Sequence, residues 1–172
     1  MPAATHTLVI GYGSPIRGDD AIGPLGAEAL AASALPAGVE VLARHVLTAD
    51  LVPDLAAARR VIFLDACVGG HPGQVNVQAL APQPGLASTM AHVHDPRELL
   101  AWCVALYGRA PQAWLVSAEG ASFDYAHCQL SACAQAALAD MLGTVRAMLD
   151  EPDEGSQLPA GARVSAPCAG SV

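Results

Sequence analysis

The chain has 172 residues, of which 53% are hydrophobic, 14% charged and 4% aromatic. This length can bury a sizeable core within one domain, and the apolar composition excludes an intrinsically disordered chain. The formal net charge is −8, from 16 acidic residues against 8 lysines and arginines, and the basic residues form no cluster. We therefore expect neither nucleic acid nor an anionic membrane as a partner.

The sequence contains no run that approaches the roughly 18 consecutive apolar residues needed to cross a bilayer, and no secretory signal pattern at its start. The five cysteines are odd in number and form no Cys-x-x-Cys pair, which favours reduced thiols in a cytoplasm. We predict a cytoplasmic protein with one domain over residues 1–150. Residues 151–172, rich in Pro, Gly, Ser and acidic residues, are expected to form a disordered tail.

Apolar or alternating runs predict strands, and Ala- and Leu-rich segments with capping residues predict helices. Strands are expected over 5–12, 39–46, 60–67, 74–80 and 113–118, and helices over about 21–34 and after the N-cap residues Thr48, Asp95 and Ser131. The 74–80 strand has the pattern of an edge or hairpin strand. This order predicts an α/β fold, with a doubly wound, mostly parallel sheet of about five strands between two helix layers. Right-handed crossovers should place the first and third strands side by side.

The helix after Asp95 has the strongest start signal, with Pro at its first position and Glu98 three residues after the cap. Leu99, Cys103 and Leu106 recur at i, i+4 and i+7, which predicts a buried stripe. The last helix is expected to turn one side to the core, formed by Leu138, Met141, Leu142, Val145 and Leu149.

Carboxylates follow two of the predicted strands. The first strand leads into Gly-Tyr-Gly-Ser-Pro-Ile-Arg-Gly and then the adjacent pair Asp19 and Asp20, and the third strand reaches Asp65 near its end. Ligands of open α/β sheets bind at the carboxyl ends of the strands, so Asp20 and Asp65 should share one crevice. Carboxylates this close raise each other's pKa unless a cation or hydrogen-bond donors compensate.

Two histidines, His92 and His94, precede the helix that begins after Asp95. A helix N-terminus disfavours the imidazolium ion, and neutral imidazole is the form that binds metals. Two carboxylates and one imidazole give an O,O,N set that suits Zn, Ni, Mn or Fe(II) better than Ca. Structural roles remain open for each residue taken alone, because a carboxylate at a helix start also complements the helix dipole.

The glycine-rich loop also invites comparison with a nucleotide-binding or flavodoxin-like protein. It fails the G-x-G-x-x-G pattern because Ile16 stands where the third glycine belongs, and Asp19 and Asp20 would repel a pyrophosphate. There is no G-x-S-x-G elbow, Walker loop or H-E-x-x-H motif. Nucleotide binding stays as an alternative.

Residues 9–24, 63–73 and 92–96 resemble motifs of the hydrogenase maturation endopeptidases, in the family's order, and residues 101–116 continue the match. The resemblance covers about residues 7–149. One departure is Ser14, which stands where the family usually has Asn.

The resemblance implies an endopeptidase that removes the C-terminal extension of a nickel-loaded hydrogenase large-subunit precursor. The nickel-contacting and catalytic residues of the family fall on Asp20, Asp65 and His92, with His94 as an alternate ligand. It implies that nickel comes with the substrate and is not permanently bound, and it leaves the general base open. We expect a monomer whose partner is the precursor. The alternative on the same scaffold is a binding module that checks the metal without cleaving.

Overall fold

The computed structural model describes residues 7–85, 94–125 and 128–151. Strands and helices alternate along most of this chain, as expected. The elements are β1 (Thr7–Tyr12), the 3₁₀ helix η1 (Gly18–Ala21), α1 (Ile22–Ala31), β2 (Val39–Arg44), the 3₁₀ helix η2 (Ala49–Leu51), α2 (Val52–Ala57), β3 (Arg60–Cys67), β4 (Val75–Leu80), α3 (Pro96–Tyr107), β5 (Gln112–Glu119) and α4 (Ala132–Asp150).

The five strands form one sheet in the order β2-β1-β3-β5-β4. The first four of these are parallel, and β4 runs antiparallel to β5. The prediction that β1 and β3 are neighbours is confirmed, and of the two alternatives for the 74–80 strand, edge or hairpin, the structure shows the edge position. The partner of β4 is β5, with Val77 opposite Val116, and not the strand that precedes it in sequence.

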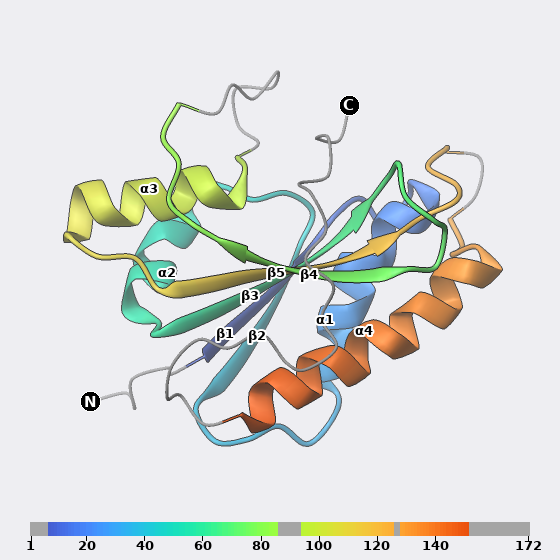
Figure 1. Ribbon diagram of the computed structural model, residues 1–172, viewed down its shortest axis with the longest axis horizontal. Coiled ribbons are helices and arrows are strands. Elements are labelled where there is room, and N and C mark those ends of the chain that lie inside the picture. The colour runs from blue at the N-terminus through green and yellow to red at the C-terminus, as the bar shows by residue number, and fades with distance from the viewer. Residues whose placement is uncertain (1–6, 86–93, 126–127, 152–172) are drawn as a thin grey trace.

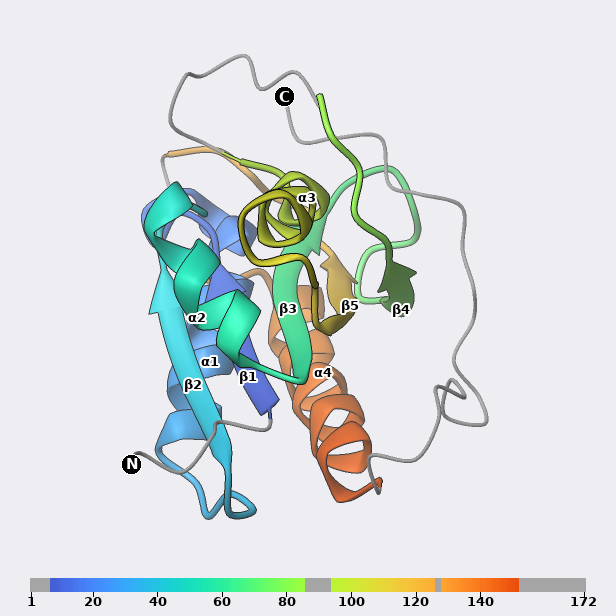
Figure 2. The same ribbon diagram turned by 90° about the vertical axis from the view of Figure 1, so that its left-hand side faces the viewer.

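The sheet lies between two helix layers, with α1 and α4 on one face and α2 and α3 on the other (Figures 1 and 2). Successive side chains of a strand point to opposite faces, so β1 contributes to two cores. Val9 joins Leu64 and Met141 on the α1 and α4 side, whereas Leu8 joins Phe63 on the α2 and α3 side. Burial on both faces explains the continuous apolar runs of the central strands. The α/β fold class is confirmed.

Helix α3 begins where predicted, because the Asp95 Oδ1 atom accepts a hydrogen bond of 2.8 Å from the Arg97 amide. Leu99 and Cys103 are buried, but the prediction for Leu106 is wrong, since this side chain is 70% exposed. Residues 104–107 are all exposed. The last turn of α3 therefore projects beyond the core, and α2, against which α3 packs, is only six residues long.

The other predicted helix starts differ in their capping chemistry. Ser131 caps α4 as expected, with its Oγ atom accepting from the Ala134 amide at 3.2 Å. Thr48 stands at the N-cap position of η2, but its hydroxyl contacts the Asp50 carboxylate and caps no backbone amide. The predicted core-facing side of α4 is confirmed. Its buried residues are Met141, Val145 and Leu149, and its partly buried residues are Leu138 and Leu142.

Within residues 7–85, 94–125 and 128–151, no helix combines the length and apolar character required to span a membrane. The prediction of a disordered tail falls on residues outside this part of the chain, apart from residue 151.

Candidate active site

The loop after β1 wraps closely around Asp20. Gly13 has a φ of +142°, and a Cβ atom there would lie 2.1 Å from the backbone oxygen of Asp20. The next amide, that of Ser14, donates a hydrogen bond of 2.8 Å to the Asp20 Oδ2 atom. The glycine is therefore required for this close approach, and the loop backbone holds the Asp20 carboxylate in place.

Asp65 lies near the end of β3, the strand next to β1, and is only partly exposed. Its Oδ1 atom accepts from the Ala66 amide at 2.8 Å, and its carboxyl group is hydrogen-bonded to the Tyr12 hydroxyl. Burial raises the pKa of Asp65 to about 8; the hydrogen bond from Tyr12 opposes this rise and the charge of Asp20 adds to it. Asp65 is therefore protonated near neutral pH unless a cation is nearby.

Tyr12, at the end of β1, is a site residue that sequence reasoning missed. Burial raises its pKa well above the usual value, and the carboxylates of Asp65, Asp95 and Asp20 add to the rise. Its ring packs edge-on against Phe63, with ring centroids 6.4 Å apart. Tyr12 is thus a neutral hydroxyl, held in one orientation, that hydrogen-bonds Asp65. In the sequence, a role for Tyr12 at the site was indicated only by its position between Gly11 and Gly13.

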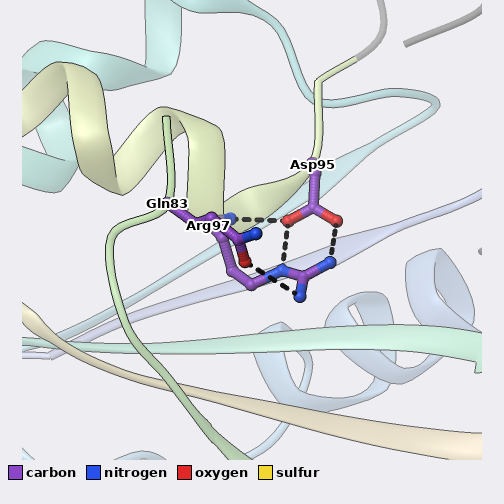
Figure 3. Close-up of polar contacts among 3 residues, drawn as sticks. All are labelled: Gln83, Asp95 and Arg97. Carbon is purple, nitrogen blue, oxygen red and sulfur yellow. Dashed lines mark hydrogen bonds and ion pairs between the residues drawn. The ribbon is translucent and has the colours of Figure 1, made fainter. Parts of the chain in front are cut away.

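Asp95 is a third carboxylate at this edge, close enough to raise the pKa of both Asp65 and Tyr12. Figure 3 shows how its charge is balanced by Arg97, through hydrogen bonds from Nε to Oδ1 at 2.9 Å and from Nη2 to Oδ2 at 2.8 Å. Gln83 accepts from the same guanidinium at 3.4 Å. Paired bonds of this kind are strong and fix geometry, so Asp95 is held as both helix cap and ion-pair partner.

The two candidate histidines differ in what can be said of them. His92 lies outside the described residues. The Nδ1 atom of His94 is 2.9 Å from the Glu98 Oε2 atom, and its ring lies 5.0 Å from that of Trp102. Glu98, part of the predicted helix start signal, thus contacts His94. A carboxylate on one ring nitrogen occurs in structural histidines, and it also orients histidines that bind a metal through the other nitrogen.

In the described part of the chain, no three His, Cys, Asp or Glu side chains are grouped so that they could hold a metal ion. The predicted metal-binding set consists of Asp20, Asp65 and His92, and His92 lies outside the described residues. The metal site, with His94 as the alternate, therefore stays a prediction.

Solved structures of hydrogenase maturation proteases share the fold of this chain. The hydrogenase maturating endopeptidase HybD from E. coli is 25% identical, with a TM-score of 0.68 over 84% of this chain and 91% of its own. The hydrogenase 2 maturation peptidase from a Thaumarchaeota archaeon is also 25% identical, with a TM-score of 0.61 over 84% and 98%. The chain is thus similar, in fold and at 25% sequence identity, to hydrogenase maturation endopeptidases.

A third member of this group, the [NiFe] hydrogenase maturation protease HycI from Thermococcus kodakarensis, is 22% identical and shares the fold, with a TM-score of 0.68 over 87% and 96% of the two chains. No protein-family model and no curated protein sequence matches the chain. The structural matches confirm both the resemblance seen in the sequence motifs and the identification of the chain as a protease.

The adjacent acids Asp19 and Asp20 lie in different surroundings. Asp19 is fully buried and accepts four hydrogen bonds: from the amides of Ala121 at 2.7 Å, Ser122 at 3.0 Å and Ser131 at 2.7 Å, and from the Ser131 hydroxyl at 2.7 Å. Burial acts to raise the pKa of Asp19, but the hydrogen bonds outweigh it and lower the pKa below its usual value. Asp19 is a buried, ionised anchor, and Asp20 is the acid at the candidate site.

Proposed function

We propose that this protein removes the C-terminal extension of a nickel-loaded hydrogenase large-subunit precursor and recognises the nickel through Asp20, Asp65 and His92. One observation carries the proposal. In a chain with the fold of the hydrogenase maturation endopeptidases, Asp20 and Asp65 interact electrostatically at the carboxyl ends of two neighbouring parallel strands. Ligands of open α/β sheets bind at that edge.

The state of Asp65 supports recognition of a cation that arrives with the substrate. Its carboxyl group is protonated near neutral pH because it is buried and faces another carboxylate. An approaching divalent ion would favour the ionised form and release the proton, so binding and deprotonation are linked. The Tyr12 hydroxyl stays neutral throughout and keeps the Asp65 carboxylate oriented.

The proposed ligand set suits nickel brought by the precursor. Two carboxylates and one imidazole leave other coordination positions for groups of the precursor itself. A metal ion bound between the two proteins would polarise the scissile carbonyl group or activate a water molecule as a Lewis acid. Recognition of the loaded precursor and its cleavage would then depend on the same three side chains.

The rim of this edge also suits a polypeptide substrate. The loops that follow the four parallel strands each expose a large apolar side chain, namely Ile16, Val46, Val68 and Tyr125. Apolar side chains gathered around a polar site are typical of a surface that binds another protein. The net charge of −8 further favours a substrate segment that is basic or carries a metal.

We also propose that the protein acts in the cytoplasm as a monomer.

The test compares nickel-loaded and nickel-free precursors after incubation with the purified protein, by intact mass. We expect shortening of the loaded precursor only. Shortening of both precursors would refute the proposed recognition of the metal. Binding of the loaded precursor without any change in its mass would show a non-cleaving module. The Asp20→Asn variant should leave the loaded precursor intact, whereas Asp140→Asn, which removes an exposed carboxylate on α4, should cleave at the wild-type rate.

A further inference from the structure

The Asp19 carboxylate joins η1 to both ends of the segment between β5 and α4. Its Oδ2 atom accepts from the amides of Ala121 and Ser122, which follow β5. Both of its oxygens accept from Ser131, which caps α4: Oδ1 from the amide and Oδ2 from the hydroxyl. A single buried side chain therefore fixes three points of the chain that are more than 100 residues away from it in sequence.

The backbone reinforces this connection. The Asp19 amide donates a hydrogen bond of 2.8 Å to the Ser122 carbonyl oxygen. Gly18 has a φ of +53°, and a Cβ atom at this position would lie 2.5 Å from the same oxygen. The first residues of η1 and the residues after β5 are thus in direct backbone contact, and neither can shift without the other.

Asp20 is the next residue of the same 3₁₀ turn. Its amide donates to the Arg17 carbonyl oxygen at 3.2 Å, and its Oδ2 atom accepts from the Ser14 amide at 2.8 Å. Adjacent residues of a short helix rotate together, so a change in the Asp19 contacts changes the direction of the Asp20 side chain. We infer that Asp19 is a positioning residue, which holds Asp20 at the sheet edge by fixing η1 to both ends of the segment from Gly120 to Ser131.

The effect on cleavage rests on the proposed function, but the effect on the placement of Asp20 does not. The substitution that tests it is Asp19→Asn. The Asn side chain has nearly the same volume as Asp and keeps one acceptor oxygen. Its NH₂ group, however, would face N–H and O–H donors that now donate to the second carboxylate oxygen. The contacts, and not the packing, are therefore what changes.

The chain offers a matched control in Glu119, another buried carboxylate at the same edge. Glu119 accepts from the Gly70 amide at 3.0 Å and from the Asn76 side-chain amide at 3.4 Å, and so anchors the turn between β3 and β4. Glu119→Gln makes the same chemical change in a carboxylate that does not hold η1. Any difference between the two variants reports on Asp20 specifically.

The first readout is hydrogen exchange of the Ser14 amide, which is bonded to Asp20 and requires no activity assay. We expect exchange to be about tenfold faster in Asp19→Asn and unchanged in Glu119→Gln. Unchanged exchange in both variants would overturn the inference. If Asp19→Asn does not fold, Ser131→Ala keeps the Asp19 carboxylate and removes one donor to it, together with the cap of α4. A smaller rise in Ser14 exchange is then expected, and no rise would overturn the inference equally.

The second readout is cleavage of the nickel-loaded precursor. Misplacement of Asp20 should lower kcat about 100-fold in Asp19→Asn with little change in KM, and Glu119→Gln should keep its kcat within about twofold of the wild type. Equal losses in both variants would show a general loss of stability and overturn the inference. A wild-type protein that fails to cleave would refute the proposed function, and the exchange of Ser14 would still decide the role of Asp19.

Discussion

Replacing Asp65 by Asn should abolish a loss of stability that the wild type undergoes as the pH rises towards about 8. The pKa of Asp65 is raised from 3.8 to about 8 in the folded state, mainly by burial. Below pH 3.8 both the folded and the unfolded state hold the proton, and the full stability is present. Between that pH and about pH 8 the unfolded state has lost its proton and the folded state has not, so stability falls as the pH rises.

The size of this effect follows from about 1.4 kcal/mol for each pH unit. From about pH 5 to about pH 8 the wild type should lose roughly 4 kcal/mol that Asp65→Asn keeps, because the amide resembles the protonated acid and has no charge to bury. Urea unfolding followed by the fluorescence of Trp102 and Trp114 would give the free energy of unfolding of both proteins across this range. Taking the difference between them cancels the other titrating groups. A difference that stays constant from about pH 5 to about pH 8 would refute this account of Asp65.

Three further predictions concern the same edge of the sheet. Gly13→Ala should lower the free energy of unfolding by at least about 2 kcal/mol, because the residue has a positive φ and its Cβ atom would overlap a backbone oxygen; a wild-type urea midpoint would contradict this. Asp95→Ala should cost about 1 kcal/mol through loss of the α3 cap, a fall of roughly 2–4 °C in Tm, and an unchanged Tm would show that the cap contributes nothing. His92→Ala should abolish cleavage of the loaded precursor, whereas His94→Ala should retain cleavage and lose about 1 kcal/mol of stability, since His94 contacts Glu98. The reverse outcome would make His94 the metal ligand.

Much of the fold could be predicted from sequence because it depends on local patterns. The bounds of β3 match the expected strand, since its apolar run is interrupted on both sides by polar or turn-forming residues. The start of α3 was also predictable, because its capping residues act within one turn. The exposure of Leu106 and the pairing of β4 with β5 were not, since both depend on how far other elements extend in space.

The candidate site was predictable only in outline. The sequence placed Asp20 and Asp65 at one edge of the sheet, and the structure shows them interacting there. It could not show that the neighbouring Asp19 is buried, because the donors that surround it come from residues 121–131, far along the chain. It also could not show that the Tyr12 hydroxyl reaches Asp65, a contact that depends on the adjacent packing of β1 and β3.

The place of β5 in the sheet has a consequence for the order in which the protein folds. β5 lies between β3 and β4, although both of these strands precede it in the chain. During synthesis β4 emerges from the ribosome with no strand to pair with until residues 112–119 have followed it. Contacts between distant parts of a chain form slowly, and unpaired strand edges are prone to aggregate. We therefore expect this side of the sheet to form late and to be the region where a nascent chain most needs protection by chaperones.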